Sequence, residues 1–205
     1  MAITLGVITN VIVAIRLIYK KFFTGRRELG QDDWVMMLAM IIGIVCTVIN
    51  VDGLTKHGLG KDVWTLQPDT LVEFGKFFYS MEVLYLAEMS LIKLSLSLFY
   101  LHIFPGSAIR RMIWATVIAN IACAIIFVIA GIVQCMPIDY FWLRYVDSNS
   151  KGHCININTF GWTHAAISIA IDIWMIAIPF SQLRKLNLHW KKKIGVIVMF
   201  LTGFL

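Results

Sequence analysis

The sequence predicts an all-α bundle of membrane-spanning helices, and three observations support this fold class. The chain of 205 residues is 59% hydrophobic and only 15% charged, with a mean hydropathy of +0.78, whereas soluble domains are about 45–50% apolar and about 25% charged. Its apolar residues form runs that approach the ~20 residues a helix needs to cross a bilayer. Short basic or glycine-rich loops separate these runs. We therefore expect a polytopic membrane protein with a single domain over residues 1–205.

The longest run, Leu71–Ile103, is expected to organise the bundle. It has no proline and one glycine, and as a helix it would span about 50 Å, more than the ~30 Å hydrocarbon core. Glu73 and Lys76 are therefore expected outside the lipid. Three ionisable residues lie deeper: Glu82, Glu88 and Lys93. A charge near the bilayer centre costs at least ~2.5 kcal/mol, so these side chains should face protein, with the other helices packed around this one.

The other spans follow from the same criterion. We expect full spans at about Ala2–Tyr19, Trp34–Val51, Met112–Gln134 and Thr159–Leu183. The apolar residues 194–205 are too few to cross a bilayer, which favours a sixth span that is cut short. Asp32 and Asp33 come just before the second span, where a carboxylate can cap a helix and favour its dipole. Glycines and Pro68 make the loop after this span rich in turns.

Basic residues predict the orientation. Loops on one side of the predicted spans hold eleven Lys and Arg residues, and loops on the other side hold five. Cytoplasmic loops carry the excess of positive charge, so we expect the N-terminus outside. An outside start with an incomplete sixth span fits a shortened seven-helix protein. The net charge of +6 is explained by these loops and does not indicate nucleic-acid binding.

Two of the four cysteines, Cys135 and Cys154, fall in one predicted outer loop. Disulfides persist in an oxidising compartment, and closing a loop of about 20 residues would contribute about 3 kcal/mol in the chain-entropy model. We expect a disulfide here. The alternatives are two free thiols or one palmitoylated thiol.

Glu88 and Lys93 are expected to form an intramembrane polar network with Asp172, which lies at a similar depth in the fifth span. Glu88 and Lys93 differ by about 140° around a helix, so they do not share a face, whereas Glu82, Lys93 and Tyr100 do. The network could bind a polar ligand, relay protons or act as a two-state switch. The alternative is a static network that only holds the helices together.

Motifs for catalysis or cofactor binding are not found. The sequence lacks the G-x-S-x-G, H-E-x-x-H and P-loop patterns, and no pair of histidines has the spacing of zinc ligands. The sequence therefore predicts no catalytic residue, no cofactor and no metal site, and a protein that is not an enzyme.

A series of short motifs resembles the fungal rhodopsin-like domain of multi-pass membrane proteins. The motifs are Gln31–Trp34, His57–Gly60, Lys93–Tyr100, Ile103–Pro105, Gln134–Pro137, Phe141–Trp142 and Gly152–Cys154, followed by Asp172 and Pro179. The resemblance covers the chain from about Arg27 onward. That family includes receptor-like proteins of filamentous fungi that are thought to couple to G proteins, some with an extracellular cysteine-rich CFEM domain.

The resemblance implies a seven-helix fold with the N-terminus outside. Four residues are candidates for coupling to a cytoplasmic G protein: Tyr100, His102, Arg110 and Arg111. The chain departs from the family pattern at His102, where the family usually has Arg or Lys. The last helix, where a retinal-binding lysine would lie, is not part of the sequence, and the family's name does not imply retinal.

The favoured function is therefore a receptor-like sensor in the plasma membrane. It would respond to an unidentified extracellular or membrane-borne ligand, with the lipid bilayer as its constant partner and a G protein as its cytoplasmic one. The alternatives are a small-solute or proton-coupled transporter, suggested by Glu88, Lys93 and Asp172, and a non-functional fragment of the family.

Overall fold

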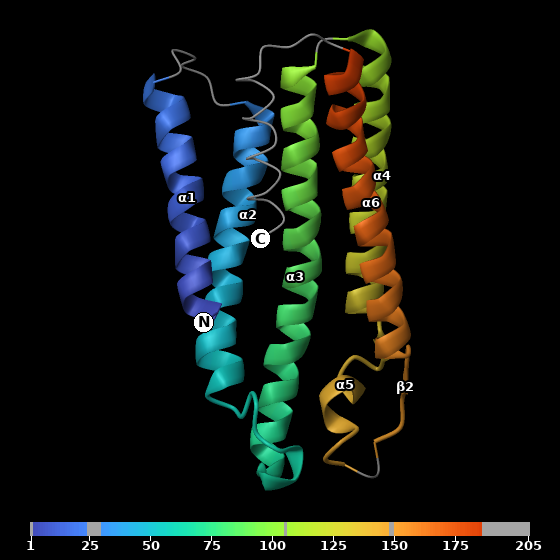
Figure 1. Ribbon diagram of the computed structural model, residues 1–205. Coiled ribbons are helices and arrows are strands. Elements are labelled where there is room, and N and C mark those ends of the chain that lie inside the picture. The colour runs from blue at the N-terminus through green and yellow to red at the C-terminus, as the bar shows by residue number, and fades with distance from the viewer. Residues whose placement is uncertain (1, 24–29, 105, 148–149, 186–205) are drawn as a thin grey trace. The chain divides into compact units, whose positions relative to one another are not determined.

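The computed structural model describes residues 2–23, 30–104, 106–147 and 150–185 (Figure 1). These residues form an almost entirely helical structure, which confirms the predicted fold class. The chain divides into two compact units, Met1–Ile157 and Asn158–Leu205, and each is described here by itself. The predicted sixth span, residues 194–205, lies outside the described residues.

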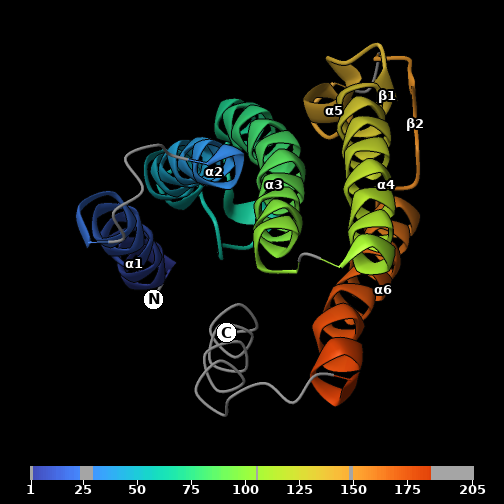
Figure 2. The same ribbon diagram turned by 90° about the horizontal axis from the view of Figure 1, so that it is seen from above.

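The first unit contains four long helices: α1 (Ala2–Phe23), α2 (Gln31–Val48), α3 (Pro68–Ile103) and α4 (Ser107–Ile132). Each of these helices packs against the next one in the sequence. Figures 1 and 2 show that α2 lies between α1 and α3. The longest helix, α3, thus packs against both α2 and α4, in agreement with its predicted organising role.

Four helical segments are long and apolar enough to cross a membrane: Gln31–Thr55, Pro68–Ile103, Ser107–Ile132 and Ile157–Ser181. They match the second to fifth predicted spans. In α1 the apolar stretch found among the described side chains is shorter, Gly6–Ile15, so a first full span stays a prediction. Large apolar side chains on these helices are exposed, for example Ile118 at 64% and Ile126 at 62%, as is expected of surfaces that contact lipid.

The boundaries of α2 differ from the prediction at both ends. The helix begins at Gln31 rather than Trp34, so Asp32 and Asp33 lie inside its first turn. At the other end it continues into a π-helix, Ile49–Thr55, beyond the predicted end at Val51. Chain reversal follows at Gly58 and Gly60, whose φ values of 110° and 86° favour glycine. A short 3-10 helix, Val63–Thr65, leads to Pro68, which takes the favoured first position of α3.

The described part of the predicted outer loop after α4 contains regular secondary structure. It contains strand β1 (Cys135–Met136), the one-turn helix α5 (Tyr140–Leu143) and strand β2 (His153–Cys154). The two strands pair antiparallel with Cys135 opposite Cys154. The second unit contains α6, which begins at Ile157 and ends at Lys185 with Pro179 inside it.

Candidate functional site: a buried polar cluster between α2, α3 and α4

Seven polar or charged side chains are buried where the start of α2, the second half of α3 and the first half of α4 meet. Each is at most 9% exposed, and we call them the polar cluster: Asp32, Asp33, Lys93, Ser95, Ser97, Thr116 and Asn120. Neighbouring helices in this unit run antiparallel, so these segments lie at the same end of the bundle (Figure 1). Burying polar groups costs free energy unless they are hydrogen-bonded, so the cluster needs specific partners.

The contact between α2 and α3 involves the two aspartates. Asp33 Oδ2 accepts a hydrogen bond of 2.9 Å from the backbone N–H of Gly30, and the Gly30 carbonyl accepts one of 3.1 Å from the Asp33 N–H. This reciprocal pair caps the helix. On α3, the Ser95 hydroxyl donates to the Asp32 carbonyl oxygen at 3.0 Å. The backbone of the first turn of α2 is thereby hydrogen-bonded to the second half of α3.

The contact between α3 and α4 involves Ser97, which is completely buried. Its hydroxyl donates to the Lys93 carbonyl at 2.8 Å and accepts a hydrogen bond of 3.2 Å from the Asn120 side-chain amide on α4. Ser95 and Ser97 are two residues apart, about 200° around the helix. Ser95 therefore hydrogen-bonds to α2, and Ser97, on the opposite side of α3, hydrogen-bonds to α4.

The residues predicted for coupling lie around this cluster. Tyr100 is buried at 3% exposure, with its ring edge-on to Phe104 at 6.3 Å. His102 is half exposed, and its Nδ1 lies 3.8 Å from the buried Asp32 carboxylate. Arg110 and Arg111 are exposed on the first turn of α4. The structure therefore gathers Lys93 and Tyr100 at the buried centre and leaves His102 and the arginines at the rim.

Glu88 lies against α2. A methyl carbon placed on Gly43 would come within 2.7 Å of Glu88 Oε1. Asp172 is on α6 in the second unit. Its pairing with Glu88 or Lys93, as expected from the sequence, stays a prediction.

The opposite end of α3 holds the folded loop after α4. Cys135 and Cys154 are joined by a disulfide, which confirms the predicted pair. Beside it, the buried side chain of Gln134 donates to Glu82 Oε2 on α3 at 3.0 Å, and the Gln134 carbonyl accepts a 2.8 Å bond from the Ile155 N–H. Glu82, which lies in the predicted membrane region, is therefore hydrogen-bonded to the side-chain amide of Gln134.

Aromatic side chains complete the attachment of this loop to α3. The Tyr79 hydroxyl donates to the Ile132 carbonyl at 2.8 Å, and its ring lies 5.4 Å from that of Phe141 and 6.0 Å from that of Trp142 on α5. Gly75 permits the close approach, because a methyl carbon there would lie 2.7 Å from Trp142 Cβ. We call residues 134–156, held by the disulfide and these contacts, the tethered loop.

Sequence reasoning missed most of the polar cluster. It assigned Asp32 and Asp33 only a capping role, although both are 2% exposed, and it gave Ser95, Ser97 and Asn120 no role. The motifs Gln31–Trp34 and Lys93–Tyr100 both belong to the family resemblance, and the structure brings them together through the Ser95–Asp32 hydrogen bond.

Comparison with known proteins identifies the family. The model of the fungal rhodopsin domain matches residues 15–205. The chain belongs to the fungal rhodopsin domain family. It is 33% identical over 152 residues to a SAT4 family membrane protein of Emericella nidulans, covering 72% of this chain and 38% of that protein. No solved structure matches it significantly.

Two further relatives of this fungal rhodopsin domain protein align over nearly the whole chain. Receptor GIN3 of Arthrobotrys oligospora is 25% identical over 96% of this chain and 46% of its own length. The polyenoic acids biosynthesis gene cluster protein Ba17b of Metarhizium anisopliae is 23% identical over 96% of this chain and 53% of its own length. The chain thus spans about half the length, or less, of the curated relatives it matches.

Proposed function

We propose that this chain is the transmembrane part of a receptor-like sensor in which α3 connects the tethered loop to the polar cluster. The observation that carries the proposal is the position of both sites on one continuous helix. Tyr79 packs against the aromatic rings of the tethered loop and Glu82 accepts a hydrogen bond from it, while Lys93, Ser95 and Ser97 lie in the cluster farther along. One relative, Receptor GIN3, is named as a receptor, which supports the same function.

The hydrogen bonds of the polar cluster suit a switch between two arrangements of the helices. Its hydrogen bonds join three helices through single side chains, and a buried polar group that loses its partner costs about 1–3 kcal/mol. A shift of α3 would therefore exchange one set of bonds for another rather than deform the cluster gradually. Such a rearrangement would alter the adjacent surface around His102, Arg110 and Arg111, where we place a cytoplasmic G protein.

The sensor requires a defined orientation in the plasma membrane, and this gives a direct test. With the N-terminus outside, an epitope tag within residues 20–32 or 184–193 should be cytosolic, and one within residues 151–156 should be extracellular. Antibody labelling of intact and permeabilised cells distinguishes these positions. Labelling of the 184–193 tag in intact cells, with protection of the 151–156 tag, would reverse the orientation and place the tethered loop in the cytosol.

Signalling can be tested without knowing the ligand, because a weakened cluster should populate the active state. In proteoliposomes that contain the full-length protein and a purified fungal G-protein heterotrimer, Asn120→Ala is expected to accelerate nucleotide exchange about tenfold over the wild type. Adding Arg110→Glu and Arg111→Glu should remove the acceleration. Equal exchange rates with the wild type, Asn120→Ala and empty vesicles would contradict G-protein coupling.

A proton-coupled transporter is the second candidate, favoured by the carboxyl group of Glu88 between α2 and α3. The same vesicles, loaded with a pH-sensitive dye, separate the two functions. The sensor predicts dye responses equal to those of empty vesicles under an imposed pH gradient. A protein-dependent proton flux that Glu88→Gln abolishes would favour transport. The expectation that the chain is not an enzyme remains a prediction.

A further inference from the structure

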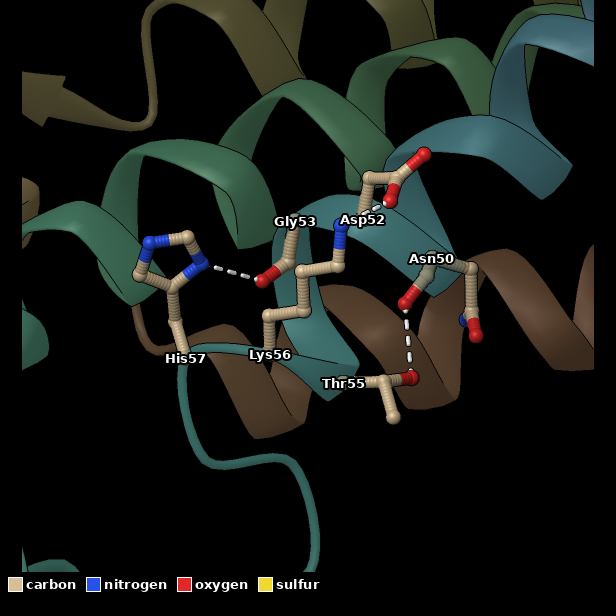
Figure 3. Close-up of polar contacts among 6 residues, drawn as sticks. All are labelled: Asn50, Asp52, Gly53, Thr55, Lys56 and His57. Atoms are coloured by element: carbon tan, nitrogen blue, oxygen red, sulfur yellow. Dashed lines mark hydrogen bonds and ion pairs between the residues drawn. The ribbon is translucent and has the colours of Figure 1, made fainter.

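His57 joins the π-helical end of α2 to α3 through both nitrogens of its ring. Nδ1 lies 2.6 Å from the carbonyl oxygen of Gly53, and Nε2 lies 2.9 Å from Oε2 of Glu73 on α3. The ring also lies 5.2 Å from that of Phe77, centroid to centroid. Figure 3 shows the imidazole directed at the Gly53 carbonyl. We call these contacts the His57 clasp.

The clasp is complete only when the ring carries two hydrogens. A backbone carbonyl oxygen can only accept a hydrogen bond, so Nδ1 must donate to Gly53. A carboxylate also only accepts, so Nε2 must donate to Glu73. Neutral imidazole has one N–H and one acceptor nitrogen, and either tautomer would therefore set two acceptors against each other at one of the two contacts.

We propose that His57 is a proton-binding site that fastens this end of α2 to α3. When the ring binds a proton, both contacts form and the clasp is closed. When the proton leaves Nε2, that nitrogen and the Glu73 carboxylate face each other as acceptors, and the clasp opens. Histidine suits this role because it is the ordinary side chain whose charge changes in the pH range of cells and their surroundings.

The other charged groups near the ring are engaged elsewhere or exposed. On the π-helical turn, Asp52 and Lys56 form an ion pair with each other, and their side chains are 59% and 67% exposed (Figure 3). On α3, Lys76 lies over the Trp142 ring of α5 at 5.9 Å. Three more are exposed: Lys61 and Asp62 in the connection between the helices, and Asp69 in the first turn of α3. Among the described residues, Glu73 is therefore the charged group in contact with the ring.

The backbone around the clasp can convert the loss of one contact into movement. A methyl carbon on Gly53 would lie 2.7 Å from the Phe77 ring, so the closed π-helical turn sits directly against α3. Beyond His57 the chain enters the left-handed turns at Gly58 and Gly60. Opening at Glu73 would thus release a turn whose next residues are glycines that tolerate large backbone changes.

Hydrogen exchange measured by mass spectrometry on the full-length protein in lipid nanodiscs tests this proposal. After correction for intrinsic rates, the amides of residues 50–60 should exchange about tenfold faster at about pH 8 than at about pH 5.5, which bracket the usual change in histidine charge. In Glu73→Gln the amide can donate to Nε2 of the neutral ring, so exchange should be slow at both pH values.

Lys56→Gln is the matched control, because it removes a neighbouring charge without touching the ring, and it should keep the pH dependence. Equal corrected exchange at both pH values in the wild type would overturn the proposal, as would pH dependence that survives in Glu73→Gln. The measurement needs no ligand or G protein, so its outcome is independent of the sensor function.

Discussion

Replacing Ser97 with leucine is expected to lower the free energy of unfolding by about 4 kcal/mol, the largest effect of any single change considered for this chain. The site is completely buried, and overpacking a filled core typically costs about 1–3 kcal/mol. The substitution also removes the acceptor of the Asn120 amide, and an unsatisfied buried donor costs about 1–3 kcal/mol more. Unfolding by SDS titration in mixed micelles measures the difference.

Two control variants separate the causes of this effect. Ser97→Ala removes the hydroxyl without adding volume, so only the smaller, hydrogen-bond part of the loss should remain. Ser90 makes a similar bond to the carbonyl four residues earlier, at 2.8 Å, but is only partly buried, so Ser90→Leu should cost far less. Equal losses for Ser97→Leu and Ser90→Leu would show that the Ser97 site is not the tightly packed contact described here.

Replacing Gly75 with leucine should detach the tethered loop from α3 and cost about 3 kcal/mol. The first added carbon would already lie 2.7 Å from Trp142 Cβ and 3.3 Å from its Cα, so the side chain and the backbone of α5 must both move. Within the described residues of its own unit, Gly161 on α6 has no atom beyond the adjacent helical backbone within 4 Å of that position. Gly161→Ala should therefore stabilise its helix by up to about 1 kcal/mol, and the same titration should show opposite signs for the two sites.

The sequence predicted the long helices well because a bilayer imposes a simple rule of length and apolarity. Helices long and apolar enough to cross a membrane are found where the second to fifth spans were predicted, and the Cys135–Cys154 disulfide is confirmed. The ends of α2 were less predictable. Asp32 and Asp33 are charged residues that would ordinarily mark a loop, yet tertiary packing places them in the buried first turn of the helix.

The polar cluster could not be derived from the sequence because it depends on which face of α3 meets which neighbour. Ser95 and Ser97 look equivalent in the sequence, but the first bonds to α2 and the second to α4. The predicted network of Glu88, Lys93 and Asp172 stays a prediction, because its third member lies in the second unit. Glu88 itself lies against Gly43 of α2, a contact that depends on helix azimuth as well as depth.

The central claim is that α3 couples the tethered loop to the polar cluster, and hydrogen exchange in the Gly75→Leu variant of the full-length protein tests it most directly. Two sites that are coupled by 1–3 kcal/mol change each other's equilibria by about 5–150-fold. We therefore expect the amides of Asp33 and Trp34, which donate to the Gly30 carbonyl at the far end of the bundle, to exchange at least about fivefold faster than in the wild type. Faster exchange confined to residues 134–156, with Asp33 and Trp34 unchanged, would contradict the account.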